Sequence, residues 1–161
     1  MRRSLITVAA VAVTLPLGIL IGQFDLQGAS ARDEIIVMEH ASSDTVIDNG
    51  DPGDTAGDTL VFANDIYDAD DVNLIGSDQG SCVRVKAASK KDAVDGLWEC
   101  NWTVSLADGN LSVQGKSVDD GTATTLTVTG GTGAYASASG EMLLEPINDG
   151  AEYRFTFRID D

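Results

Sequence analysis

The sequence predicts an all-β domain of eight short antiparallel strands. Apolar and polar residues alternate with a period of two in several runs, most clearly over residues 151–160. Turn signals rich in glycine and aspartate separate these runs, and no convincing helical repeat follows residue 31. An open sandwich and a closed barrel both fit this pattern. Eight strands close into a barrel just wide enough for side chains or one small ligand.

The first 31 residues have the features of a signal peptide. A basic start precedes an uncharged run over residues 5–24, and an A-x-A exit follows at 29–31. We therefore expect a signal peptide over residues 1–31 and one domain over residues 32–161. The mature protein would be secreted or periplasmic, with no membrane association after cleavage. An uncleaved N-terminal membrane anchor is the alternative.

The acidic composition bears on which partners and ions the protein could bind. The net charge of -16 at pH 7 repels nucleic acid, so we expect no nucleic-acid partner. The acidic runs at 48–54 and 68–71 lack the spacing of an EF-hand. We interpret them as solvated loops and expect no metal, with calcium binding as the alternative.

Residues 131–136 fit the dinucleotide-binding pattern G-x-G-x-x-A. A strand is predicted after them instead of the helix that such a site needs, so we interpret them as a turn and expect no cofactor.

The first predicted strand, 34–41, places a carboxylate on an apolar face. Glu39 shares that face with Ile35 and Val37, and burial there should raise its pKa. A raised carboxyl pKa suits general acid or base catalysis near neutral pH. The alternatives are pairing with an inward arginine or a position in water at the barrel mouth. His40, the only histidine, points outward by parity, which argues against a hydrolytic triad.

The second predicted strand, 57–67, places an amide on an apolar face. Asn64 alternates in phase with Phe62 and Ile66. A buried amide must find hydrogen-bond partners. Asn64 is therefore predicted either to hold a bound water or ligand oxygen, or to satisfy the backbone.

The next two strands, 79–88 and 96–107, are predicted to form a hairpin with its loop centred near Lys91. That register places Cys82 directly opposite Cys100. An exported protein should pair them in a disulfide, worth about 2–4 kcal/mol.

The same parity points one cation inward. Arg84 is predicted beside the ring of Trp98, where it either neutralises Glu39 or is turned outward by a bulge. The remaining strands are expected within 111–144 and at 151–160. The predicted inward aromatic residues are Phe62, Trp98, Trp102, Tyr153, Phe155 and Phe157. A cavity lined by this set would favour an apolar guest.

Four motifs resemble plant allene oxide cyclase. They are GD-x-L-V-F-x-N-x-x-Y at 57–67, G-x-C-V at 80–83, LSVQG at 111–115 and TGG-x-G ending in glycine at 129–140. The wider superfamily includes dirigent proteins and bacterial barrel cyclases. The resemblance implies a closed eight-stranded antiparallel barrel, lipocalin-like in outline, and a homo-oligomer, either trimer or dimer.

The resemblance also implies site residues. Glu39 matches the glutamate that polarises the substrate, and Asn64 matches one of two asparagines that hold a water. The second asparagine falls on Ala41 and is missing, as is a Ser-Pro pair after the first strand. A pocket cysteine matches Cys82, and a pocket tyrosine matches Trp102. The water site is therefore incomplete, and the oxylipin reaction itself is in doubt.

The sequence thus leads to a small-molecule cyclase or isomerase acting on a hydrophobic substrate in the barrel cavity. Glu39 and Asn64 are the candidate catalytic residues. The candidate substrate-binding residues are Phe62, Arg84, Trp98, Trp102, Tyr153 and Phe155. A dirigent-like or lipocalin-like carrier of an apolar ligand is the alternative, and a filled structural barrel is a third interpretation.

Overall fold

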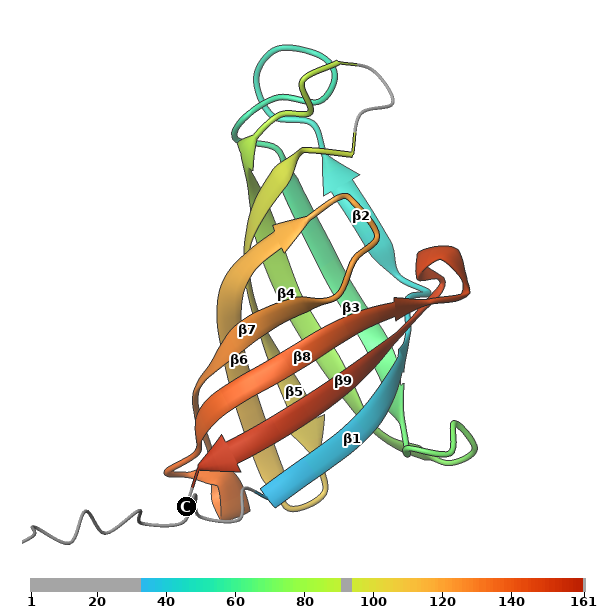
Figure 1. Ribbon diagram of the computed structural model, residues 1–161, viewed down its shortest axis with the longest axis vertical. Helices are drawn as coiled ribbons and strands as arrows, with labels where there is room; N and C mark the ends of the chain where they lie inside the picture. Colours follow the sequence, from blue (N-terminus) through green and yellow to red (C-terminus); the bar gives the residue numbers. More distant parts are fainter. Residues whose placement is uncertain (1–32, 91–93, 161) are drawn as a thin grey trace, which may run out of the picture.

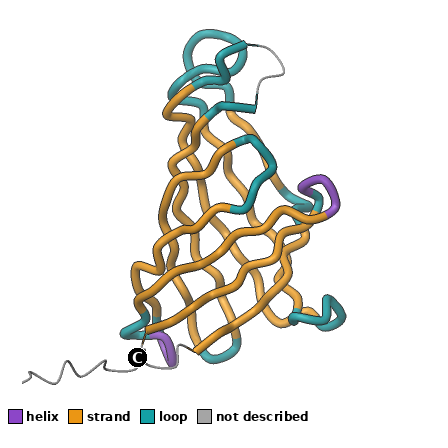
Figure 2. Tube along the Cα trace, viewed as in Figure 1, coloured by secondary structure: helices purple, strands orange, loops and turns teal. Residues whose placement is uncertain are grey.

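The computed structural model describes residues 33–90 and 94–160. The predicted signal peptide and Lys91 lie outside this range. The strands are β1 (Asp33–His40), β2 (Asp44–Ile47), β3 (Thr59–Tyr67), β4 (Leu74–Lys86), β5 (Leu97–Leu106), β6 (Gly109–Val118), β7 (Thr124–Gly131), β8 (Ser139–Ile147) and β9 (Glu152–Asp160). Two short 3₁₀ turns, η1 (Gly133–Tyr135) and η2 (Asn148–Gly150), join β7 to β8 and β8 to β9 (Figure 2).

The strands form a closed antiparallel barrel (Figure 1). Every neighbouring pair from β3 to β9 is antiparallel, and β1 pairs with β9 on one side and with β3 on the other. The barrel wall therefore has eight strands, and β2 continues along the edge of β3 beyond the end of β1. This arrangement confirms the barrel and rules out the open sandwich.

Two strand boundaries differ from the prediction. Residues 44–47 form β2, which is not among the predicted strands, and all four of its side chains are exposed. β4 begins at Leu74 instead of residue 79. Its inward positions near that end are Gly76 and Asp78, which carry no apolar side chain, so the alternation is invisible in the sequence.

The barrel interior is packed by alternate side chains from each strand. The residues that are at most 2% exposed include Val37, Ile66, Val104, Leu111, Val113, Leu126, Val128, Met142, Phe155 and Phe157. Gly80 allows a close approach of two strands, because a Cβ there would lie 2.2 Å from the Cβ of Trp102 on β5. No larger residue fits opposite that indole ring.

The glycine-rich segment after β7 is a tight turn, as interpreted from the sequence. Gly133 has φ +62, and a Cβ on Gly131 would lie 2.3 Å from the carbonyl oxygen of Asn110. The turn packs against the connection between β5 and β6, and β8 follows at once. A nucleotide-binding helix is therefore absent from this segment.

Among the residues that the structure describes, no helix could span a lipid bilayer.

Candidate functional site

A cavity of about 100 Å³ lies inside the barrel. It is lined by Glu39, Asp44, Leu60, Phe62, Cys82, Cys100, Trp102, Ser117, Leu144, Tyr153 and Phe155. These residues come from β1 to β6, β8 and β9, on the side of the barrel toward the ends of β4 and β6. The walls are mostly apolar, and the ionisable groups gather on β1, β2 and β9.

Glu39 is the buried carboxyl of this cavity. It faces inward from β1, with Tyr153 on β9 and Ile66 on β3 as its register partners. Only 5% of the residue is exposed. Burial, followed by the nearby charge of Asp78, raises the pKa of Glu39 from 4.5 to about 8. A carboxyl group in this position holds its proton at neutral pH.

Asn64 holds Glu39 in place. Its Nδ2 donates to Glu39 Oε1 at 2.8 Å and to Asp44 Oδ1 at 2.9 Å. Its Oδ1 accepts from the backbone N–H groups of Ser42 and Ser43 at 3.0 and 2.9 Å. The side-chain amide thus has protein partners on both its donor and acceptor sides, and Asn64 ties the β1–β2 connection to β3.

Asp78 is a second buried carboxyl, which sequence reasoning missed. It lies opposite Asn64 in the β3–β4 register and is 1% exposed. Burial raises its pKa to about 6. Cys82 and Arg84 point inward, and the alternation of β4 places Asp78 on the same face. The burial of Asp78 could therefore be predicted only if β4 were known to begin at Leu74.

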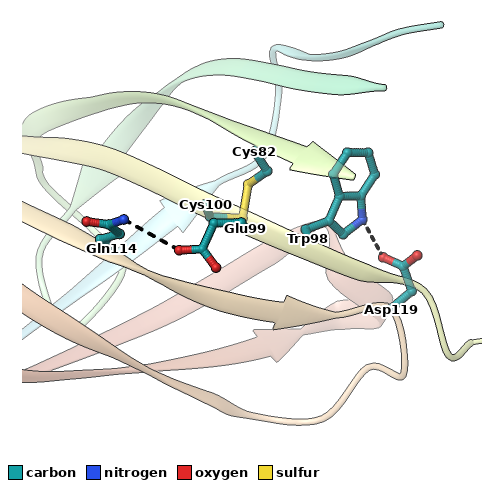
Figure 3. The surroundings of a disulfide bond; sticks show 6 residues. All are labelled: Cys82, Trp98, Glu99, Cys100, Gln114 and Asp119. Atoms are coloured by element: carbon teal, nitrogen blue, oxygen red, sulfur yellow. Dashed lines mark hydrogen bonds between the residues drawn. A yellow bond between two sulfur atoms is a disulfide. The ribbon is translucent and has the colours of Figure 1, made fainter. Parts of the chain in front are cut away.

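Arg84 does not neutralise Glu39. Its guanidinium pairs with Asp54 at 2.6 Å and with Asp119, and it lies 4.1 Å from the centroid of the Trp98 ring. The indole Nε1 of Trp98 also donates to Asp119, at 2.8 Å (Figure 3). The bulge in β4 comes after Arg84, which therefore stays inward and 8% exposed.

Arg84 and Trp98 thus form a closed cluster near the end of β4, outside the residues that line the cavity. Their predicted role in substrate binding stays a prediction. The cluster anchors the 48–58 loop, since Asp54 also accepts from the backbone of Ala88 at 2.7 Å.

The predicted disulfide is present (Figure 3). Cys82 on β4 lies directly opposite Cys100 on β5, and both sulfur-bearing residues line the cavity. The bridge therefore forms part of the wall in addition to linking two neighbouring strands. A disulfide is compatible with an extracytoplasmic protein.

The other predicted inward aromatics form a connected wall. Phe62 lies edge-on to Trp102 at 5.9 Å, and Trp102 lies 6.0 Å from Phe155. The buried Nε1 of Trp102 has no acceptor among the described residues. Tyr153 lines the cavity too, and burial together with the charges of Glu39 and Asp44 raises its pKa.

His40 faces outward, as predicted by parity. It stacks on Tyr67 at 4.2 Å, and its Nε2 lies 2.7 Å from Asp71. The ligand atoms of His40, Asp71 and Glu152 all lie within 4.8 Å of one another, which makes this the one group in the described ranges with metal-ligand spacing. It is outside the barrel and separate from the cavity.

Comparison with known families identifies the barrel. The profile of the allene oxide cyclase barrel-like domain matches residues 36–159, most of the chain. The chain belongs to this family. The resemblance seen in the four sequence motifs is thereby confirmed.

Solved structures similar to this family member share its fold. A pyocyanin demethylase is 22% identical with a TM-score of 0.69, and the match covers 80% of this chain and 100% of that one. The Diels Alderase AbmU from Streptomyces koyangensis is 21% identical with a TM-score of 0.62, covering 80% and 64%. A pterocarpan synthase dirigent protein is 13% identical with a TM-score of 0.60, covering 79% and 83%. At these identities the likeness concerns the fold alone.

Proposed function

We propose that the protein is an exported cyclase or isomerase that binds a small hydrophobic molecule in the barrel cavity. The observation that carries the proposal is a buried carboxyl group, Glu39, whose pKa is raised to about 8, in a mostly apolar cavity. Such a group can donate a hydrogen bond or a proton to a substrate oxygen near neutral pH. The family, which contains the barrel cyclases, supports the reaction class.

The cavity chemistry also supports one class of substrate. Asp44 would repel an anionic substrate, and Arg84 is paired with other acids. Trp102 supplies a second donor in the wall, since its Nε1 has no acceptor among the residues that the structure describes. We therefore infer an uncharged, largely apolar substrate with a carbonyl or epoxide oxygen.

The cavity would promote the reaction by two effects. The aromatic wall would hold a flexible substrate in a folded, reactive conformation. Glu39 would polarise the substrate oxygen as the ring closes or the double bonds shift. Product and substrate have the same atoms, so the proton that Glu39 gives at one atom returns from another.

Turnover by a glutamine variant tests this proposal. Neutral epoxides and polyenes are screened with the wild-type protein, and any conversion is then measured for Glu39→Gln. Turnover should fall at least about 100-fold, since general acid catalysis contributes about that much or more. Glu99→Gln is the matched control, because Glu99 is an exposed glutamate on β5. Full activity of Glu39→Gln would contradict the role of Glu39.

A carrier is the second candidate function. It is favoured by the apolar walls and by the fold shared with a dirigent protein. Native mass spectrometry of protein purified from its own host separates the two functions. A stoichiometric, chemically unchanged guest indicates a carrier, whereas conversion of the guest indicates an enzyme.

A further inference from the structure

Asp78 lies behind Glu39 and has an unusual environment. Its Oδ1 accepts from the backbone N–H of Asn64 at 3.2 Å. Its Oδ2 is buried and has no hydrogen-bond partner among the described residues. Unlike Glu39, Asp78 does not line the cavity. An unpaired buried carboxylate oxygen costs free energy, so this atom calls for a donor.

Glu39 is the group within reach that can supply that donor. The carboxyl groups of Glu39 and Asp78 are close enough to form a side-chain hydrogen bond. Two carboxylate oxygens cannot bond to each other without a proton between them. One proton on the pair satisfies Oδ2 of Asp78 and removes a repulsion between two buried charges.

The neighbouring groups determine which residue carries the proton. The groups that face the pair are Asn64 from β3, Asp44 from β2 and Tyr153 from β9. The backbone N–H of Asn64 stabilises ionised Asp78, while the charge of Asp78 opposes ionisation of Glu39, and the charge of Asp44 opposes ionisation of both groups. Glu39 therefore holds the proton, with one oxygen accepting from Asn64 and the other donating to Asp78.

We propose that Glu39 and Asp78 share a single proton across neutral pH, and that Asp78 is a positioning residue that lets Glu39 both give and take a proton at the cavity wall. The singly protonated pair can lose a proton to the substrate oxygen or accept one from a substrate C–H or O–H group. An isomerisation that removes a proton at one atom and returns it at another needs this capacity. The catalytic use of the pair rests on the function proposed above, whereas the shared proton does not.

Carboxyl-carbon NMR titration of the ¹³C-labelled, oxidised protein tests the shared proton without a substrate. In the wild type, both carboxyl carbons should respond to two steps, near pH 6 and pH 8. In Asp78→Asn, Glu39 should titrate in one step below about pH 7, because the negative partner is gone. In Glu39→Gln, Asp78 should titrate in one step, since glutamine mimics the protonated glutamate.

Asp44→Asn is the matched control, because it removes a nearby acid that is not part of the pair. It should lower the pKa of Glu39 less than Asp78→Asn does and keep the two-step titration of both carbons. The proposal is overturned if Glu39 titrates identically in the wild type and in Asp78→Asn. If Asp78→Asn does not fold, single independent steps at the two wild-type carbons overturn it equally.

The two proposals fail in different ways. A coupled titration in a protein that converts no substrate would leave the pair intact and contradict the enzymatic function. Turnover that depends on Glu39, without coupling to Asp78, would contradict the pair alone. Where turnover is found, Asp78→Asn should move the alkaline limb of the kcat/KM profile down by about one pH unit or more, which a purely structural role would not do.

Discussion

The two halves of the barrel interior differ in content although the same strands build both. Toward the end where β1 begins and β9 ends, the interior is packed with aliphatic and aromatic side chains, several of them at most 2% exposed, and a second pocket of about 310 Å³ lies beside Ile35, Tyr135 and Ile159. Toward the other end lies the cavity with its acids. Neighbouring inward positions on one strand fall on opposite sides of this boundary, as with Val37 and Glu39 on β1. The alternation of residues along a strand therefore determines only whether a side chain points inward. The residue type determines whether that inward position is packed in the core or belongs to the cavity.

Truncation in the packed half should have the largest effect. Phe157→Ala should lower the free energy of unfolding by about 3–5 kcal/mol, because Phe157 is fully buried and its neighbours leave a void behind. Phe62→Ala, a half-buried position on the cavity wall, should cost less than half as much. Urea denaturation measures both. Equal losses at the two positions would remove the distinction between the halves.

Removal of the disulfide should have the next largest effect. The bridge closes a loop with a sequence separation of 18 residues. The double variant Cys82→Ala, Cys100→Ala should lose about 3 kcal/mol, mainly through a less constrained unfolded chain. Calorimetry of the double variant against the oxidised wild type checks this value. A loss below about 1 kcal/mol would mean that the bridge serves the cavity wall only.

The acids of the cavity half should make stability depend on pH. The pKa of Glu39 is about 8 in the folded state and ordinarily 4.5, so the folded protein binds the proton more tightly. Its contribution is fully present below pH 4.5 and is lost as pH rises to about 8. Glu39→Gln should therefore gain about 2 kcal/mol relative to the wild type between pH 5 and pH 8.5. Parallel unfolding curves at the two pH values provide the measurement, and an unchanged difference would contradict the burial of an acid.

Charges on the outer surface should matter least. Lys86 and Asp95 form an exposed pair at 3.2 Å. Lys86→Met should change the unfolding free energy by no more than about 0.5 kcal/mol. Thermal unfolding at low and high salt checks this value. A larger loss of unfolding free energy would mean that this ion pair contributes to the stability of the fold.

The sequence predicted the features that depend on local alternation. The inward faces of β1 and β9, the opposed cysteines and the burial of Glu39 and Asn64 all follow from a period of two, once the strands are located. The family motifs then decided between barrel and sandwich. These features need no knowledge of distant contacts.

The missed features depend on contacts between distant segments. β2 has no buried side chain, so its pairing with β3 leaves no hydrophobic pattern. Arg84 meets Asp54 and Asp119, which are 30 and 35 residues away in the chain. Asp78 occupies an inward position in a stretch whose polar sequence is typical of a loop. For Arg84 and Asp78, polar partners in the folded structure take the place of apolar neighbours, and for β2 the backbone pairing with β3 does so.

The pKa of Glu39 in the wild-type protein tests the account most directly. The carboxyl-carbon signal, assigned with Glu39→Gln, would be followed from pH 3 to pH 10. A principal transition near 8 is predicted, and it would establish a protonated carboxyl in the cavity at neutral pH. A transition near about 4 would mean a solvated or paired carboxylate, and it would contradict both the acid role of Glu39 and its shared proton with Asp78.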